Sequence, residues 1–404
     1  MKIAIFGASG FVGATLVERL VARDDIDLRL FIRSFGNAWR LAKAGIPMRT
    51  VDVTSARQVN EAVAGCTHVV NCTRGSSAVM IGGLQNLLAA SKVSGVKRFV
   101  HLSSVAVYGD FPPPESERES APAKPAPKSY GEEKLKQDDM VARATDSGLD
   151  CVVLCPPNIS GVYSSFVSNV LADMRAGSFA LIDGGGRALN VVDVDNLAHA
   201  IVLALEIPKG DGRRIFISDG EGIAWKDLAD ALLPLAEFAG PVPIVPASSL
   251  ALAASPAARP GSLWRSMKHL VSSDVREALR RDPLLAKFDK QMRKLGAIGG
   301  KAMEDRLRHS IEGAIKVAKV RDPNLYSSRY NAMQLRGVWH SIDRARDTLG
   351  YRPVLSFSES MARFRVWYKT MHGFGEDYWP LARKLVDFKL ETVPSGEAKR
   401  ASDS

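Results

Sequence analysis

Short apolar runs alternate with stretches of helical spacing along the first part of the chain. The apolar runs are residues 2–6, 28–32, 48–53, 69–72, 98–103 and 150–154. Between them, apolar residues recur every three or four positions in residues 11–20, 37–44, 59–64, 79–90 and 129–147. Buried strands that alternate with helices over short loops require right-handed crossovers. The pattern therefore predicts an α/β fold with a doubly wound parallel sheet.

The regular alternation of predicted strands and helices ends after residue 157. We expect a helix over 166–175, a glycine turn at 184–186, a strand over 189–192 and a helix over 196–206. This change predicts a Rossmann-type cofactor domain over residues 1–160 and a smaller C-terminal substrate domain over 161–392. Within the latter, residues 250–335 form an expected helical basic insertion, and residues 393–404 an expected disordered tail.

The composition narrows the class of protein. The chain has 404 residues, of which 46% are hydrophobic and 24% charged, as in ordinary soluble proteins. No apolar run reaches the roughly 18 residues of a membrane span. The first strand begins at Lys2, so we expect a cytoplasmic protein without a signal peptide. The four cysteines lack metal-ligand spacing, which predicts buried thiols and no metal site.

The net charge of +10 is concentrated in one window. Residues 261–321 hold 15 Lys and Arg against 7 Asp and Glu, so the rest of the chain is nearly neutral. This distribution argues against a nucleic-acid-binding protein. Two interpretations of the window remain open. Its apolar helix faces pack as a lid on the substrate domain or a second subunit, or they bind peripherally to an anionic membrane at its inner face.

The first turn of the chain carries a candidate cofactor site. Gly7, Gly10 and Gly13 recur every third residue between a strand and a helix, with Ser9, Phe11 and Val12 among them. Glycine permits a tight turn and lets a pyrophosphate approach free helical N–H groups. Three glycines alone are a weak signal, but their place between strand and helix favours a dinucleotide site.

Three further residues suit hydride-transfer chemistry. Ser104 follows the fifth predicted strand, and Tyr130 and Lys134 lie four residues apart at the start of the next helix. A phenol needs its pKa of about 10 lowered by roughly three units to act as a base near neutrality. A cation about 4 Å away supplies a comparable energy, so Lys134, with an oxidised nicotinamide, is expected to activate Tyr130. Ser104 is expected to hold the substrate oxygen.

These motifs resemble the extended short-chain dehydrogenases/reductases, often called the NAD-dependent epimerase/dehydratase family. The matching stretches are GASGFVG, VKRFVHLSSVAVYG, SYGEEK, PPNISG, NVVDVDNLAHA and, late in the chain, DRARDTLGYRP. The resemblance implies a catalytic triad and a homodimer. It implies contacts of Asp52 and Val53 with the adenine, and of Asn158 with the substrate. Its further cofactor-binding positions are Cys72, Thr73 and Pro157.

The resemblance leaves the reaction open. We expect an NAD(P)-dependent epimerase or ketoreductase that acts on a nucleotide-linked sugar. The alternatives are an NADPH-dependent reductase of a non-sugar ketone and a non-catalytic dinucleotide-binding scaffold. Val105 and Ala106 stand where related dehydratases carry an Asp-Glu pair, which argues against a dehydratase. The family often has Arg where this chain has Cys155, and small residues where it has Asn71 to Arg74.

The cofactor preference depends on one strand end. An acidic residue after the second strand usually binds the ribose 2′-hydroxyl of NAD. Here Arg33 occupies that place, and a guanidinium suits the 2′-phosphate of NADP. The sequence thus indicates NAD or NADP with a modest preference for NADP, the alternative being that Arg33 is only a solvated strand-end residue.

Overall fold

The computed structural model describes residues 1–220, 222–236, 240–250 and 328–372. Contacts divide the chain into a larger unit, Met1–Ala236 with Val242–Ala247 and Val320–Ser404, and a second unit, Glu237–Pro241 with Ser248–Lys319. All helices and strands named below lie in the larger unit. The basic window 261–321 and the tail 393–404 lie outside the described residues.

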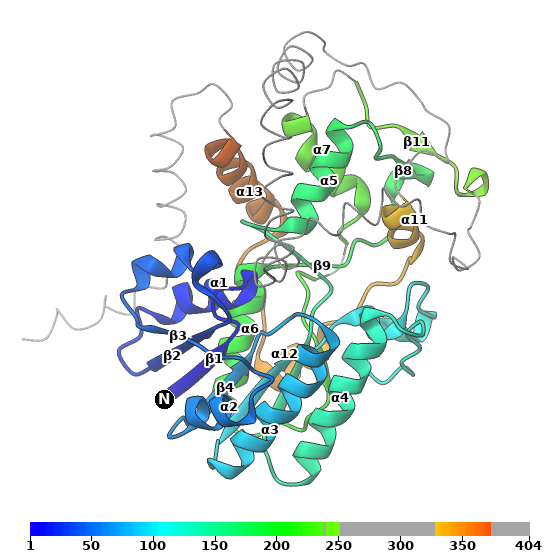
Figure 1. The fold of residues 1–404 in the computed structure, drawn as a ribbon. Helices are drawn as coiled ribbons and strands as arrows, with labels where there is room; N and C mark the ends of the chain where they lie inside the picture. Colours follow the sequence, from blue (N-terminus) through cyan, green and yellow to red (C-terminus); the bar gives the residue numbers. More distant parts are fainter. Residues whose placement is uncertain (221, 237–239, 251–327, 373–404) are drawn as a thin grey trace, which may run out of the picture. The chain divides into compact units, whose positions relative to one another are not determined.

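Seven parallel strands form the central sheet in the order β10-β6-β5-β4-β1-β2-β3 (Figure 1). They are β1 (Lys2–Phe6), β2 (Asp27–Ile32), β3 (Met48–Thr50), β4 (His68–Asn71), β5 (Arg98–Leu102), β6 (Cys151–Cys155) and β10 (Arg214–Phe216). The strand order reverses between β1 and β4, and sheets of this kind bind ligands beyond the carboxyl ends of their strands at that point. The predicted Rossmann-type sheet is confirmed.

Helices cover both faces of this sheet (Figure 1). One face packs against α1 (Phe11–Leu20), α6 (Val194–Glu206) and α12 (Asp343–Leu349), and the other against α2 (Ala56–Val63), α3 (Leu84–Val93) and α4 (Tyr130–Asp146). Successive strand residues point to opposite faces. Ile3 and Ile5 therefore belong to the first apolar core, and Ala4 and Phe6 to the second.

The remaining described elements form the smaller part of this unit. They are α5 (Ser165–Arg175), α7 (Trp225–Ala236), α11 (Ser328–Leu335) and α13 (Phe357–His372), with the strand pairs β7 (Asn158–Ser160)–β9 (Val191–Asp193) and β8 (Leu181–Ile182)–β11 (Ile244–Val245). Helix α7 packs against α5 and α13, and α11 packs against β8. Residues from before 250 and after 327 thus build this part together.

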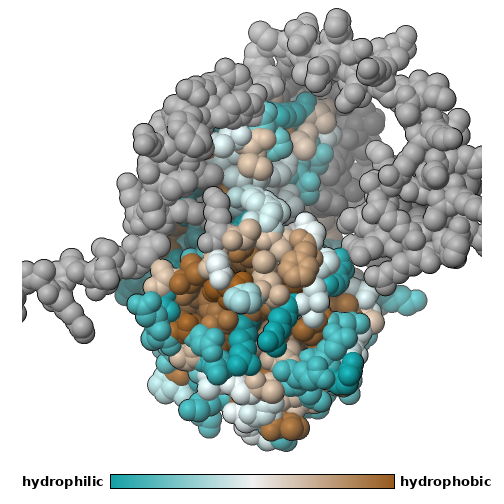
Figure 2. All heavy atoms as spheres, turned by 60° about the vertical axis from the view of Figure 1, so that its left-hand side comes forward, coloured by the Kyte–Doolittle hydropathy of each residue, from teal (hydrophilic) through white to brown (hydrophobic). Residues whose placement is uncertain are grey.

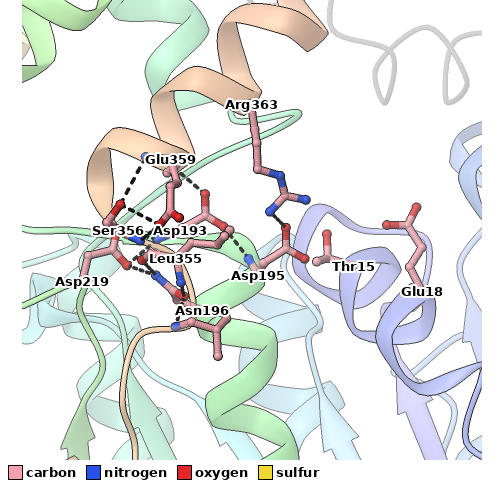
Figure 3. A network of polar contacts seen from close by, with 12 residues as sticks. Thr15, Glu18, Asp193, Asp195, Asn196, Asp219, Leu355, Ser356, Glu359 and Arg363 are labelled. Atoms are coloured by element: carbon pink, nitrogen blue, oxygen red, sulfur yellow. Dashed lines mark hydrogen bonds and ion pairs between the residues drawn. The ribbon is translucent and has the colours of Figure 1, made fainter. Parts of the chain in front are cut away.

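A buried polar network joins α6 to the segment that precedes α13 (Figure 3). The Asn196 side-chain oxygen accepts hydrogen bonds from the N–H groups of Val354 at 2.7 Å and Leu355 at 2.9 Å. Its amide nitrogen donates to the Leu355 carbonyl at 2.8 Å and to Asp219 at 2.7 Å. Asp219 also accepts from the Asp193 N–H at 2.8 and 2.9 Å. The C-terminal segment is therefore fixed to the sheet domain by fully paired polar groups.

Three predicted elements differ in detail from the observed ones. The expected helix over 37–44 is a pair of 3-10 helices, Phe35–Asn37 and Trp39–Ala44, because so short a segment gains little from cooperative helix formation. The helix expected over 79–90 begins as a π-helix at Ala78–Gly83. The strand expected over 48–53 stops at Thr50 because Asp52 accepts hydrogen bonds from the Thr54 N–H and hydroxyl, at 2.9 and 2.7 Å, and forms a turn.

The described surface carries scattered apolar side chains. Phe35 and Trp39, in the segment after β2, are 59% and 58% exposed. Figure 2 shows one face on which apolar side chains gather in a region bordered by hydrophilic ones. Within the residues that the structure describes, no helix combines the length and the apolar character needed to cross a membrane.

Candidate active site

Glycine residues shape the turn between β1 and α1. Gly7 has a φ of +79°, and a Cβ on it would lie 2.7 Å from the Cys72 carbonyl oxygen. A Cβ on Gly13 would lie 2.3 Å from the Gly7 carbonyl oxygen. Contacts this short exclude any side chain, so the turn packs directly against the loop after β4.

The N-terminus of α1 fits a pyrophosphate. Gly10 precedes the helix, and no side chain caps it. The N–H groups of Phe11, Val12 and Gly13 have no acceptor within the helix and lie at the positive end of its dipole. Because glycine leaves the approach open, these residues fit a dinucleotide cofactor, with Ser9 beside them.

The other predicted cofactor residues follow neighbouring strands. They are Arg33 after β2, Asp52 and Val53 after β3, Cys72 and Thr73 after β4, and Pro157 after β6. Because the strands are parallel, these positions lie at the same edge of the sheet as the glycine turn. Val53 and Pro157 are buried, and Arg33 is exposed. Asn158 begins β7 next to Pro157 and is partly buried.

Ser104 and Tyr130 are brought together by a close contact between backbones. Ser104 ends the loop after β5, and its hydroxyl accepts a hydrogen bond from the Ala106 N–H at 3.3 Å. Tyr130 is the first residue of α4. A Cβ on Gly131 would lie 2.1 Å from the Ala106 carbonyl oxygen, so only glycine lets the helix begin directly against this loop. Ser129 caps the helix by accepting from the Glu132 N–H at 3.2 Å.

Lys134 lies one helical turn beyond Tyr130 and is 4% exposed. Its ammonium donates to the Leu102 carbonyl at 2.8 Å and lies 5.8 Å from the centroid of the Tyr130 ring. Burial lowers the pKa of Lys134 to about 8, against the raising effect of the Asp138 carboxylate. The ammonium is thus held beside the phenol and keeps most of its charge near neutral pH.

Tyr130 is 38% exposed. Burial of its hydroxyl nevertheless raises its pKa above the usual value, and the foremost opposing charge is the Arg74 guanidinium. The sequence predicts the opposite direction, with Lys134 and an oxidised nicotinamide as the cause. In the protein by itself, the desolvation of the Tyr130 hydroxyl therefore outweighs the effect of the nearby charges on its pKa.

Two residues at the site were not predicted. Asp138 is buried one turn after Lys134, accepts from the Ser103 hydroxyl at 2.8 Å and pairs with Arg214 at 3.2 Å. Because residues four apart lie on the same face of a helix, the sequence could have indicated that Asp138 lies near Lys134. Arg74 follows β4 and places its guanidinium carbon 5.1 Å from the centroid of the Tyr130 ring. The only hint was its departure from the small residues of the family.

The cysteines carry no metal chemistry in the described structure. All four are free thiols, with Cys66, Cys151 and Cys155 buried and Cys72 partly buried. Burial raises the pKa of the Cys72 thiol to about 12. Among the described residues, no group of His, Cys, Asp or Glu could hold a metal ion.

Comparison with known proteins shows the family of this chain. Residues 3–217 match the NAD dependent epimerase/dehydratase family. A 4-hydroxy-2-methyl-3-oxo-4-farnesyl-3,4-dihydroquinoline-1-oxide ketoreductase of Stigmatella aurantiaca is 28% identical over 279 residues, which cover 66% of this chain and 82% of the relative. The UDP-glucose 4-epimerase of Vibrio cholerae is 26% identical, over 57% of this chain and 74% of its own.

A third relative is the 2-alkyl-3-oxoalkanoate reductase of Shewanella oneidensis, 28% identical over 57% of this chain and 64% of its own. The family match spans the cofactor turn, the Ser104 loop and the helix that carries Tyr130 and Lys134. The relatives are epimerases and reductases, which makes this protein an enzyme of the oxidoreductase or epimerase type. The chain therefore belongs to the NAD-dependent epimerase/dehydratase family.

Proposed function

We propose that the protein interconverts a secondary alcohol and a ketone by hydride transfer, as an epimerase or ketoreductase, on a nucleotide-linked sugar. The observation that carries this proposal is the Lys134 ammonium 5.8 Å from the centroid of the Tyr130 ring, on a helix whose Gly131 packs directly against Ala106 in the segment after Ser104. Similarity to a UDP-glucose 4-epimerase supports the sugar substrate. Residues 1–160 hold the cofactor in this proposal, and residues 161–392 supply the substrate domain.

The roles of the side chains follow from their chemistry. A bound nicotinamide supplies the hydride or takes it up. In reduction, the Tyr130 hydroxyl gives its proton to the carbonyl oxygen, to which Ser104 donates a hydrogen bond, and the alcohol forms. In oxidation, the Tyr130 phenolate takes the proton of the alcohol. The Lys134 ammonium stabilises that phenolate.

The test compares the net change in cofactor with the amount of product formed. The purified protein is supplied with UDP-glucose and either NAD or NADP, and its own bound cofactor is identified by mass. An epimerase is expected to hold NAD tightly and to form the C4 epimer with no net change in cofactor. A reductase, run in reverse on the sugar alcohol, is expected to exchange its cofactor and to reduce one NADP for each keto product formed. A chain that binds dinucleotide but converts no substrate supports the scaffold alternative and contradicts the proposal.

A second candidate is a reductase of a non-sugar ketone. It is favoured by two relatives, the ketoreductase of Stigmatella aurantiaca and the oxoalkanoate reductase of Shewanella oneidensis. The chemistry at Tyr130 is the same, and only the substrate differs. Consumption of reduced cofactor with a 3-oxoalkanoate, and not with 4-keto sugars, supports this candidate.

We also propose a modest preference for NADP. Arg33 follows β2 and is exposed at the edge where the adenine ribose of a dinucleotide is bound in such sheets. A 2′-phosphate gains charge-assisted hydrogen bonds from a guanidinium. Titration of both cofactors, repeated with Arg33→Ala, tests this preference. Tighter binding of NAD that the substitution leaves unchanged contradicts it.

Assembly and location are further proposals. The family resemblance supports a cytoplasmic homodimer, which sedimentation of the purified chain tests. The positive surplus of residues 261–321 supports either a lid or peripheral contact with an anionic membrane at its inner face. Vesicle sedimentation at low and high salt, with and without residues 261–321, distinguishes the two. Equal behaviour of both chains favours the lid.

A further inference from the structure

A hydrogen-bonded turn in the loop after β4 precedes Arg74, which lies next to the ring of Tyr130. Asn71 is buried at the end of β4, and its side-chain oxygen accepts from the Thr73 N–H at 3.1 Å and the Thr73 hydroxyl at 2.7 Å. This turn fixes the direction of the next residue, Arg74. The guanidinium carbon of Arg74 lies 5.1 Å from the centroid of the Tyr130 ring. Its position is therefore set by the backbone and by stacking on the ring.

Arg74 differs from the other cations of the site because its charge faces outward. In the described part of the chain, no hydrogen bond or ion pair joins it to a carboxylate, and its side chain is exposed. Lys134 is buried and bonded to the Leu102 carbonyl. Asp138 is engaged by Ser103 and Arg214.

Glu133 also acts on the pKa of Tyr130, in the direction opposite to Arg74, and no ion pair joins it to Arg74 among the described residues. The Tyr130 ring thus lies next to the Arg74 guanidinium, to which no anion is bound among the described residues. Stacking on the Tyr130 ring requires neither the positive charge of the Arg74 guanidinium nor its exposed N–H donors. A planar guanidinium matches the two oxygens of a carboxylate, which it binds through parallel hydrogen bonds.

The position of the charge restricts where the anion sits in the substrate. Tyr130 exchanges its proton with the oxygen of the reacting carbon in the proposed function. The guanidinium carbon lies 5.1 Å from the centroid of that phenol ring, so a carboxylate that reaches it belongs within a few bonds of the reacting carbon. A β-keto acid has this arrangement, with one carbon between the ketone and the carboxylate. A hexuronate oxidised at C4 has the same arrangement.

We propose that Arg74 binds a substrate carboxylate placed β to the reacting carbonyl, and that the substrates of this enzyme are β-keto acids and the corresponding β-hydroxy acids. This inference rests on the proposed hydride transfer at Tyr130. It unites the two candidate functions, because a nucleotide-linked uronate and a 3-oxoalkanoate share the group that Arg74 recognises. The name of the Shewanella oneidensis relative describes a substrate of this kind.

The test compares acids with matched neutral compounds. Binding to the wild-type chain is measured by calorimetry, with oxidised cofactor present for the keto compounds and reduced cofactor present for the sugar alcohols, so that neither pair is converted. The pairs are a 2-alkyl-3-oxoalkanoate with its methyl ester, and UDP-glucuronate with UDP-glucose. Arg74→Gln is expected to weaken binding of the preferred acid by roughly 10- to 100-fold, the scale of hydrogen bonds to a charged group. Binding of its neutral partner is expected to change less than about threefold.

Two further variants sharpen the result. Arg74→Lys keeps the charge without the planar fork and is expected to restore part of the acid binding. Arg213→Gln removes an exposed arginine next to the amino end of β10, at the opposite edge of the sheet, and is expected to change nothing. Equal losses for acid and neutral partner overturn the proposal, as does a wild type that prefers neither acid.

The other source of an anion is the cofactor. Weaker binding of NAD or NADP by Arg74→Gln, with no acid preference lost, assigns the guanidinium to a cofactor phosphate and overturns the proposal. Failure of the proposed function has a different signature. In that case the wild type binds the acid through Arg74 but consumes no NADH or NADPH with it.

Discussion

The pKa of Tyr130 reflects two opposing effects in the protein. Burial raises it, and the nearby positive charge of Arg74 lowers it. Lys134 is itself buried enough for its pKa to fall to about 8, so its charge is sensitive to pH just above neutrality. A carboxylate bound beside Tyr130 would further favour the protonated phenol. In the proposed reduction, the protonated phenol is the form that gives its proton to the carbonyl oxygen.

The first prediction concerns the phenol itself. Tyr130→Phe removes the proton donor and leaves the glycine turn intact, so turnover is expected to fall by at least about 100-fold while the cofactor still binds. Initial rates and cofactor titration on the same preparation measure the two effects. Turnover close to that of the wild type would remove Tyr130 from the mechanism.

The second prediction concerns Gly131. A Cβ there would lie 2.1 Å from the Ala106 carbonyl oxygen, whereas a Cβ on Gly82 would meet nothing within 4 Å. Gly131→Ala is expected to move the start of α4 away from Ser104, with activity lowered by about tenfold or more and stability by roughly 1–3 kcal/mol. Gly82→Ala is the matched control and is expected to leave both unchanged. Equal effects would show that the close contact does not matter.

At the scale of elements, one arginine joins β5 to the end of α6. Arg98 is 4% exposed and donates to the carbonyls of Ala204 at 2.6 Å and Ile207 at 3.0 Å. Its Nε lies 2.8 Å from an Asp150 carboxylate oxygen. The last carbonyls of a helix have no partner within it. Arg98 thus satisfies them and places α6 on the sheet.

The third prediction follows from this contact. Arg98→Met is expected to lower the free energy of unfolding by about 3 kcal/mol, because it leaves buried carbonyls and part of a carboxylate unpaired. Lys226→Met breaks the exposed pair with Asp230 on α7 and is expected to cost less than about 1 kcal/mol. Urea denaturation of both variants measures the difference. A loss as small for Arg98 as for Lys226 would contradict the assigned role.

The elements also show what sequence patterns can predict. The apolar runs at residues 2–6 and 28–32 are continuous because both faces of a parallel sheet are buried, so their strands could be predicted. Strand β10 has three residues, too few for a periodic signal. In the proline-rich segment 110–128, Ser116 is fully buried. Its carbonyl contacts the His340 ring at 2.7 Å, from a segment far away in the sequence.

The residues of the site also differ in whether the sequence could predict them. Ser104, Tyr130 and Lys134 could be proposed because strand ends and helix spacing place them by local rules. The contact of Arg74 with Tyr130 depends on how two loops meet across the sheet edge, and no local pattern encodes that. The direction of the Tyr130 pKa shift depends on burial, which is likewise a property of the folded chain.

At the scale of the whole molecule, two neighbouring carboxylates affect stability. Asp193 is 1% exposed and Asp219 is partly buried, and the N–H of Asp193 donates to the Asp219 carboxylate. Burial is the main cause that raises the pKa of Asp193 to about 6 and that of Asp219 to about 7, helped by the negative charge of Asp195 in the first case and of Asp193 in the second. Since the folded protein holds these protons more tightly than the unfolded chain, their contribution is full below about pH 4 and is lost as the pH rises through about 7.

The fourth prediction uses this pH dependence. Asp193→Asn keeps an oxygen for the Asp195 N–H and a polar partner for the Ser360 hydroxyl, and it removes one of the two charges. The decline in stability between about pH 4 and 7 is expected to be smaller in the variant by roughly 1–2 kcal/mol. Urea unfolding at several pH values measures it. A variant with the same decline as the wild type would show that the two carboxylates are not the source.

The hydrogen bonds around Asn196 join two parts of the chain that are far apart in the sequence. The segment after residue 327 is bonded to residues that precede 250, through Asn196 to Leu355 and through Gln334 to the Ala180 carbonyl and the Ile182 N–H, both at 2.8 Å. These contacts do not depend on a peptide connection across 251–327. Two separate polypeptides, 1–250 and 328–404, are therefore expected to recognise each other and assemble by fragment complementation when they are expressed together.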